Sequence, residues 1–337
     1  MNKNIVLWLS LLFANQLCQA MQPESKIFVA GHNGLVGSAI CRALKKAGYQ
    51  NLVVRSSKEV NLCNQAAVEN FFMTEQPEYV FLVAAKVGGV YANMSHPSDF
   101  IYQNLMIEAN VIHAAYKYGV KKLIFIGSSC IYPRDCPQPI KEQYLLTQPL
   151  EPTNEWYGLA KIVGIKLCQA YNQQYQANFI SCAPTNIYGP GDKFTIENAH
   201  VVAALIRKFC DAKEKEFKEV SIYGTGNALR EFLYVDDLAE ATIFLMQNYN
   251  DNSPINIGSG SDISIRDLAE KIKALVGFDG EIVFDKTKPD GNPKRLLDTS
   301  RINQIGWKAK TDLDHGLKNT IDWYIQNKFK SEEVAQC

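Results

Sequence analysis

The stretch that decides the fold is Lys26-Ile-Phe-Val-Ala30-Gly31-His-Asn-Gly34-Leu-Val-Gly37, which is followed by a helical pattern from Ser38 to Ala47. Its apolar start is typical of a buried parallel strand. Glycines in the turn permit a sharp bend, close approach to a pyrophosphate and tight helix-on-strand packing, and the helix N-terminus offers N–H groups to an anion. The alternative is a glycine-rich turn that binds nothing. We expect a dinucleotide here, contacted by Gly31, Gly34, Leu35, Val36 and Gly37.

The same alternation of strand and helix continues along the chain. Strand-like segments at 51–54, 79–83, 122–126 and 178–182 alternate with helical patterns. This order predicts an α/β fold with a doubly wound parallel sheet, a Rossmann fold, and ligands at the carboxyl ends of its strands. We expect residues 26–190 to form the NAD(P)-binding domain and 191–330 a smaller α/β substrate domain, with 220–250 returning to the first. A final helix near 313–329 should precede a disordered tail, 331–337.

The composition fits a globular enzyme of 337 residues, of which 47% are hydrophobic. Lys+Arg and Asp+Glu both number 35, so the formal charge of zero does not suggest a nucleic acid or an anionic membrane as partner. The nine cysteines form no C-x-x-C pair, so we expect neither a zinc site nor a disulfide framework. Such cysteine usage is typical of a reducing compartment, and we predict a cytoplasmic location.

Residues 1–20 have the pattern of a secretory signal peptide: one lysine, an apolar stretch from Ile5 to Leu17 and a small residue at Ala20. The stretch is too short for a membrane span. The cysteines and a cytosolic cofactor oppose export, and Met21 lies five residues before Lys26, where the fold begins. We expect residues 1–25 to be a leader or an incorrect start outside the fold, with export as the alternative and no membrane contact in the mature protein.

A second decisive stretch is Tyr157-Gly-Leu-Ala-Lys161, at the start of a helix for which Pro152 and Thr153-Asn154 supply stop and cap signals. The four-residue spacing places the phenol and the ammonium on one helix face. Because a nearby cation stabilises phenolate, the pKa of Tyr157 is predicted to fall toward neutral pH. Such a tyrosine can protonate a carbonyl oxygen as a hydride reaches the carbon. The alternative is a surface pair on an amphipathic helix.

Residues 127–133, Gly-Ser-Ser-Cys-Ile-Tyr-Pro, place hydroxyls at the end of the strand 122–126. Ser128 and the Tyr-x-x-x-Lys pair, taken together with the G-x-x-G-x-x-G turn, resemble the catalytic set of the extended short-chain dehydrogenase/reductase superfamily. The run from Ser128 to Pro133 is similar to that of the GDP-L-fucose synthases, and the likeness extends from Lys26 to Phe329. On its own, Cys130 would more often be an inert small residue.

The resemblance implies a 3,5-epimerase and 4-reductase that acts on GDP-4-keto-6-deoxy-D-mannose, a sugar nucleotide. It implies a homodimer through helix 99–118 and the Tyr157 helix, although plain sheet packing would explain the same apolar residues. It also implies these catalytic residues: Ser128, Tyr157, Lys161, Cys130 and His200. Which of Cys130 and His200 is acid or base stays open, as does the nucleotide base. The alternatives are another sugar-nucleotide epimerase or dehydratase and a protein that senses NAD(P) without turnover.

The second strand predicts the cofactor, because it ends in Arg55-Ser-Ser-Lys58 without an acid. Arg and Lys suit a 2′-phosphate, whereas an acid would bind a ribose 2′-hydroxyl. We therefore expect NADPH, with NADH not excluded. The family usually has basic residues where Asn33 and Ser57 stand, so Arg55 or Lys58 would bind the phosphate. The resemblance adds these cofactor contacts: Asn61, Lys161, Pro184, Asn186 and His200.

Residues 230–237, Arg-Glu-Phe-Leu-Tyr-Val-Asp-Asp, resemble a run shared by sugar-nucleotide enzymes. Arg230 has the planar fork that grips a diphosphate. Asp236 and Asp237 are expected to cap a helix at 238–246, and the charged run 211–218 to be a solvated loop. The basic loop 285–295 suits either phosphates or a plain surface. The candidate substrate residues are Lys208, Tyr223, Arg230, Asp290 and Arg295.

Overall fold

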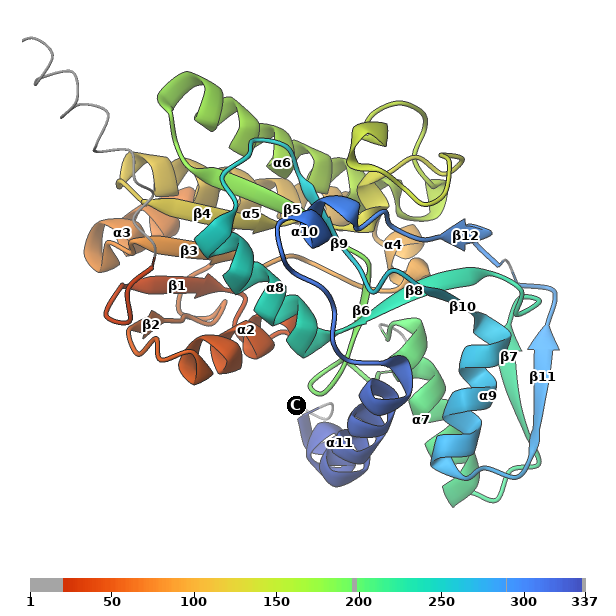
Figure 1. Ribbon diagram of the computed structural model, residues 1–337. Helices are drawn as coiled ribbons and strands as arrows, with labels where there is room; N and C mark the ends of the chain where they lie inside the picture. The colour runs from red at the N-terminus through yellow and green to blue at the C-terminus, as the bar shows by residue number, and fades with distance from the viewer. Residues whose placement is uncertain (1–20, 196–198, 289, 335–337) are drawn as a thin grey trace, which may run out of the picture.

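The protein's structure is a computed structural model that describes residues 21–195, 199–288 and 290–334 (Figure 1). Residues 1–20, on which the signal-peptide prediction rests, lie outside this part of the chain. Within the described residues, no helix combines the length and the apolar character that a bilayer crossing requires.

The centre of the molecule is a six-stranded parallel sheet in the order β2-β1-β3-β4-β5-β9. Its strands, in chain order, are β1 Ile27–Ala30, β2 Leu52–Val53, β3 Tyr79–Leu82, β4 Lys122–Ile126, β5 Phe179–Pro184 and β9 Ile255–Ile257. The strand order reverses at β1, so the carboxyl ends of β1 and β3 border the crevice where a doubly wound sheet binds its ligand.

Helices cover both faces of this sheet (Figure 1). Along β1, Ile27 and Val29 point into one apolar core and Phe28 into the other, because successive side chains of a strand point to opposite faces. The first core is shared with α2 Leu35–Lys46 and α8 Val235–Asn248, and the second with α3 Gln65–Glu75, α5 Pro97–Lys117 and α6 Glu155–Tyr175. The predicted doubly wound α/β fold is confirmed.

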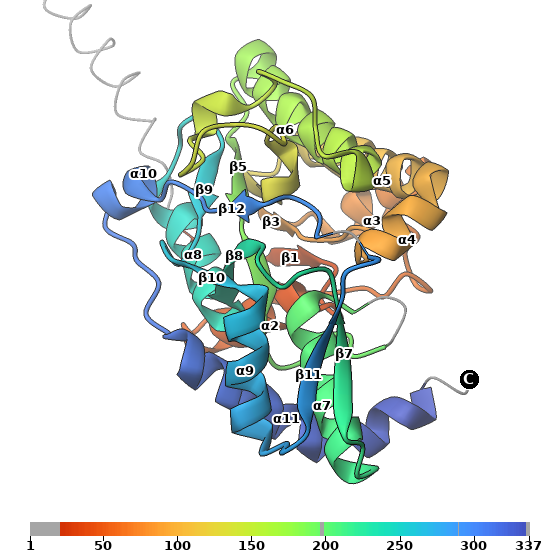
Figure 2. The same cartoon turned by 90° about the vertical axis from the view of Figure 1, so that its right-hand side faces the viewer.

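The second half of the chain forms smaller sheets beside the first. Strand β8 Leu229–Tyr234 pairs with β6 Asn186–Tyr188, β10 Asp262–Ser264 and β12 Lys294–Arg295, while β7 Glu219–Tyr223 pairs with β11 Glu281–Asp285. A third apolar core lies beneath α7 Val201–Glu214, α9 Ile265–Val276 and α11 Leu313–Val334. Figure 2 shows β7, β11 and these helices gathered at the end of the molecule away from α5 and α6. The short helices are α4 Val90–Ser95, α10 Ser300–Gln304, η2 Ser129–Ile131, η3 Glu142–Tyr144 and η4 Pro152–Asn154.

Two sequence predictions about charged segments are wrong. The run 211–218 is not simply a solvated loop, because α7 continues to Glu214 and Asp211 pairs with Lys328 of α11 at 3.0 Å. The acids at the start of α8 do not cap it, because Tyr234 is the N-cap residue. Asp237 instead accepts hydrogen bonds from the backbone N–H groups of Lys310 and Thr311. These partners come from distant segments, which a local pattern does not reveal.

Helix α11 extends to Val334, past its predicted end at Phe329 and into the predicted tail.

Candidate functional site

The turn between β1 and α2 has the shape of a nucleotide cradle. Gly31 has a φ of +91°, and a Cβ there would lie 2.8 Å from the backbone nitrogen of Ala84, which follows β3. A Cβ on Gly37 would lie 2.1 Å from the Gly31 carbonyl oxygen, whereas one on Gly34 would meet it at an ordinary 3.5 Å. Only glycine fits at 31 and 37, so helix and strand approach as closely as a dinucleotide site requires.

The N-terminus of α2 is open to an anion. No side chain caps it at Gly34, and its first turn contains no acid. The first N–H groups of a helix have no partner within the helix, so those of residues such as Leu35 and Val36 are oriented to bind a diphosphate. The described residues of this turn therefore fit a dinucleotide cofactor.

Ser128, Cys130 and Tyr157 lie together at the carboxyl end of β4. Ser128 is the N-cap residue of η2, and its hydroxyl accepts a hydrogen bond of 3.2 Å from the backbone N–H of Cys130. Tyr157 stands in the first turn of α6, where its phenol is near enough to Ser128 for that hydroxyl to favour the phenolate slightly. Two hydroxyls and a thiol thus share one strand end, which is the arrangement needed to handle a carbonyl oxygen and the protons beside it.

The prediction that Lys161 lowers the pKa of Tyr157 is wrong. Desolvation of the phenol, followed by the charges that Cys130 and Glu108 can carry, raises the pKa of Tyr157 well above 10. The Lys161 ammonium lies 5.8 Å from the centre of the Tyr157 ring but only 3.2 Å from a carboxylate oxygen of Glu108. Because desolvation of the phenol outweighs the distant Lys161 ammonium, Tyr157 keeps its proton at neutral pH and can act as a proton donor.

Glu108 is a residue of this site that sequence reasoning missed. It lies in α5, and the side chains of Glu108 and Lys161 are 0% and 1% exposed. Burial raises the pKa of Glu108 to about 7, against the opposing pull of Lys161. The available signal was a single acid in the apolar part of α5, after Asp99 in its first turn. The sequence prediction for this helix left a subunit interface and plain sheet packing open and did not consider a buried ion pair.

His200 lies at the N-cap position of α7 and makes no side-chain cap. Its neighbour Ala199 lies against Gly89, where an added Cβ would be 3.2 Å from the Ala199 carbonyl, so this segment borders the loop after β3. Desolvation and then the charge of Lys193 lower the pKa of His200, although the side chain still reaches solvent. Among the described residues, no hydrogen bond joins His200 to Cys130.

Three of the predicted substrate residues, Arg230, Asp290 and Arg295, lie together beside this strand end. Arg230 and Arg295 are register partners in β8 and β12, and Arg295 also donates a hydrogen bond to the carbonyl of Ser129 in η2. Desolvation and the charge of Arg295 lower the pKa of Arg230 to about 10. Arg230 donates to the backbone carbonyl of Asp290 at 3.2 Å.

Lys208 and Tyr223 form a separate contact within this predicted substrate group. The Lys208 ammonium lies 4.9 Å from the centre of the Tyr223 ring, and Tyr223 is 64% exposed. An exposed ring beside cations is suited to a nucleotide base with its phosphates.

Residues 27–258 match the NAD dependent epimerase/dehydratase family. GDP-L-fucose synthase 1 from Arabidopsis thaliana is 56% identical over 304 residues, which cover 90% of this chain and 94% of that protein. The chain belongs to this family, among its GDP-L-fucose synthases. The family prediction made from the Ser128 run and the glycine turn is confirmed.

Two solved structures of this family have the same fold. A GDP-L-fucose synthetase from Naegleria fowleri bound to NADP is 30% identical, with a TM-score of 0.86 over 92% of this chain and 95% of that one. A GDP-mannoheptose C4 reductase from Campylobacter jejuni with NADP bound is 42% identical, with a TM-score of 0.84 over 91% of this chain and 100% of that one.

The remaining predicted cofactor residues of this chain are dispersed around the edge of the sheet. Arg55 donates to the carbonyl of Val54 and pairs with Glu75. Lys58 and Asn61 are exposed. Pro184 ends β5, and the Asn186 amide donates to the Glu231 carbonyl at 2.9 Å.

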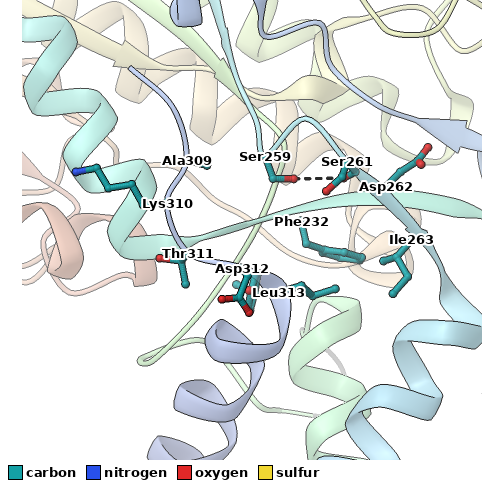
Figure 3. Close-up of a pocket in the computed structure, with 11 residues that line it drawn as sticks. Phe232, Ser259, Ser261, Asp262, Ile263, Ala309, Lys310, Thr311, Asp312 and Leu313 are labelled. Atoms are coloured by element: carbon teal, nitrogen blue, oxygen red, sulfur yellow. Dashed lines mark hydrogen bonds between the residues drawn. The ribbon is translucent and has the colours of Figure 1, made fainter. Parts of the chain in front are cut away.

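A cavity of about 460 Å³ lies between β8, β10 and the start of α11 (Figure 3). None of the predicted site residues lines it; its walls are Tyr188, Phe232, Ser259, Ser261, Asp262, Ile263, Ala309, Lys310, Thr311, Asp312 and Leu313. The cavity is thus distinct from the site that Ser128 and Tyr157 form in this chain.

Proposed function

We propose that the protein is a GDP-L-fucose synthase, which converts GDP-4-keto-6-deoxy-D-mannose to GDP-L-fucose by 3,5-epimerisation and NADPH-dependent reduction at C4. The observation that carries this proposal is that Ser128, Cys130 and Tyr157 lie together at one strand end. The two-step reaction needs both groups that hydrogen-bond the carbonyl oxygen and a group that exchanges protons. The full-length similarity to a GDP-L-fucose synthase supports it.

The epimerase step uses the two hydroxyls and two proton-exchanging side chains. The hydrogens on C3 and C5 flank the C4 carbonyl, so removing one as a proton leaves its electron pair in an enolate. Ser128 and Tyr157 stabilise the enolate oxygen by hydrogen bonds. Thiols and imidazoles exchange protons near neutral pH, so of Cys130 and His200 one takes the proton and the other returns one to the opposite face.

NADPH, when bound, supplies the hydride that reduces C4. Tyr157 gives its proton to the C4 oxygen, which its raised pKa keeps available. Lys161 supports Tyr157 and the cofactor ribose, and the Gly31–Gly37 turn holds the diphosphate. Further cofactor contacts are assigned to Arg55, Lys58, Asn61, Pro184, Asn186 and His200. The GDP moiety is assigned to Lys208, Tyr223, Arg230, Asp290 and Arg295.

The proposal also covers the roles of the two domains and the oligomeric state. Residues 26–190 would bind the cofactor and 191–330 the substrate, in the cytoplasm. A homodimer would form through α5 and α6, which expose large apolar side chains. The most exposed of these are Tyr102 at 63% and Tyr175 at 44%, with Trp156 and Val163 at 43% and 40%.

A second candidate function is C4 reduction without epimerisation. The similarity to the GDP-mannoheptose C4 reductase favours it, because that structure is matched over its whole length. The two candidates share Ser128, Tyr157 and Lys161 and differ in the use of Cys130 and His200.

The test is conversion of GDP-4-keto-6-deoxy-D-mannose by protein that begins at Met21, wild type beside Cys130→Ala. NADPH consumption is followed by absorbance and the product is identified by chromatography. We expect GDP-L-fucose from the wild type, and reduction without epimerisation or little turnover from the variant. No oxidation of NADPH or NADH by the wild type would refute the substrate assignment.

A further inference from the structure

Asn154 occupies a helix N-cap position but does not cap the helix. It precedes α6, and asparagine is among the best capping residues, as our reading of Thr153-Asn154 assumed. Its side chain makes no capping hydrogen bond to α6. The amide nitrogen instead donates to the sulfur of Cys130 at 3.2 Å. The capping prediction is therefore wrong for this side chain, which is directed at the thiol.

The backbone around Asn154 holds this orientation. Its N–H donates to the carbonyl of Glu151 at 3.1 Å, which closes the η4 turn. The Glu151 carboxylate accepts hydrogen bonds from the backbone and hydroxyl of Thr153 and lies 3.5 Å from the Arg134 guanidinium. These contacts hold the backbone of η4, from which the Asn154 amide reaches Cys130.

The side-chain oxygen of Asn154 is a buried hydrogen-bond acceptor for which the described residues supply no donor. Asn154 Oδ1 is buried and has no hydrogen-bond partner among the described residues. Nearly all buried polar atoms in folded proteins are paired, so an unpaired acceptor beside the Cys130 thiol indicates a group that completes its hydrogen bond with a ligand. A sugar hydroxyl is such a donor.

Cys130 is itself fixed in place. Its N–H donates to Ser128, and α6 packs so closely on it that a Cβ on Gly158 would lie 2.8 Å from the Cys130 carbonyl oxygen. In the described part of the chain, Asn154 is the hydrogen-bond donor to the sulfur. The other titratable groups near this turn are Tyr157 from α6 and Arg295 from β12, whose guanidinium binds the Ser129 carbonyl.

We propose that Asn154 is a positioning residue for Cys130: its amide N–H stabilises the thiolate and aims it at the sugar carbon, and its Oδ1 accepts a hydrogen bond from a sugar hydroxyl. A hydrogen bond to a charged acceptor is stronger than one to its neutral form, so the amide favours the thiolate without adding a charge. The thiolate takes the proton from carbon as an S–H group forms, and the C–H electron pair enters the enolate. This inference rests on the proposed epimerase function of Cys130.

The test is the pH profile of Cys130 alkylation by iodoacetamide, read by mass spectrometry of the peptide that contains it, in wild type and Asn154→Asp. Aspartate keeps the shape but replaces the donor by a carboxylate that repels the thiolate. We expect the midpoint to rise by about one to two pH units, and alkylation at pH 7 to fall about tenfold or more. The epimerisation rate should fall in parallel and recover at higher pH, with NADPH affinity unchanged.

Two further variants make the result decisive. Asn154→Ser removes the donor without adding a charge and should shift the midpoint in the same direction by less. Asn64 does cap its helix, α3, by accepting from Ala67 N–H at 3.0 Å, so Asn64→Asp should leave the alkylation profile unchanged.

An unchanged midpoint in both Asn154 variants, even with a lower melting temperature, would leave Asn154 a purely structural residue and overturn the proposal. Alkylation needs no turnover, so the profile separates this inference from the proposed function. A shifted midpoint in a protein that does not epimerise would refute only the function.

Discussion

Tyr157→Phe is expected to lower kcat for C4 reduction by about 10²–10⁴-fold, the usual contribution of a positioned proton donor. The substitution removes the only atom of the ring that can protonate the C4 oxygen, and it leaves the T-shaped contact with Phe100, whose ring centre lies 6.5 Å away. The measurement is single-turnover NADPH oxidation with saturating keto sugar. NADPH affinity and melting temperature should stay close to wild type.

A residual rate within a factor of about ten of wild type would assign the proton to another group. The protonation state can be checked directly by the tyrosinate absorbance of wild type minus Tyr157→Phe without cofactor. Because desolvation raises the pKa of Tyr157, the difference spectrum should show no tyrosinate between pH 7 and 9. A tyrosinate signal in that range would mean that Lys161 lowers the pKa after all.

Glu108→Gln is expected to stabilise the cofactor-free protein by about 2–3 kcal/mol at pH 8 and to leave its stability unchanged near pH 4.5. Burial raises the pKa of Glu108 from 4.5 to about 7 although Lys161 is adjacent, so desolvation outweighs the ion pair. A carboxyl with a raised pKa stabilises the folded state below the unfolded value of 4.5, and this contribution is lost as the pH rises to 7. A neutral amide avoids that loss. The measurement is urea unfolding at several pH values.

Glu69 supplies the matched control with the opposite sign. The hydrogen bond from Lys117 on the surface lowers the pKa of Glu69, so its ionised form favours folding above pH 4.5. Glu69→Gln should therefore lose a little stability at pH 8. If Glu108→Gln were less stable than wild type at both pH 8 and pH 5, the ion pair with Lys161 would outweigh the desolvation. We also expect reduced turnover in Glu108→Gln, because Glu108 orients Lys161.

The parts of the fold that sequence predicted correctly depend on local signals. The strand Ile27–Ala30 is apolar at every position and is followed by glycines that no other residue could replace at 31 and 37, so the cradle was readable directly. The meeting of Ser128 with Tyr157 followed from a strand end and a helix start that the family resemblance identified. The first of these signals lies within one short stretch, whereas the second depended on the family resemblance.

The failures involve partners that are distant in sequence. The pKa of Tyr157 was predicted from Lys161, four residues away, but burial of the phenol raises this pKa and Glu108 of α5 pairs with Lys161. Asn154 was read as a cap from its propensity, whereas its side chain turns to Cys130 on a different turn. Helix propensity and spacing describe one element at a time, so contacts between α5, α6 and η2 had no signal in the local pattern.

The most direct test of the proposed two-step activity is to run the reaction in D₂O with NADPH and GDP-4-keto-6-deoxy-D-mannose, and to locate deuterium in the product by NMR. Each epimerisation replaces a carbon-bound hydrogen by one from solvent, whereas the hydride at C4 comes from the cofactor. We predict GDP-L-fucose with deuterium at C3 and C5 and protium at C4, and loss of the C3 and C5 label in Cys130→Ala. A reduced product with protium at both C3 and C5 would contradict the proposal and leave the protein a C4 reductase.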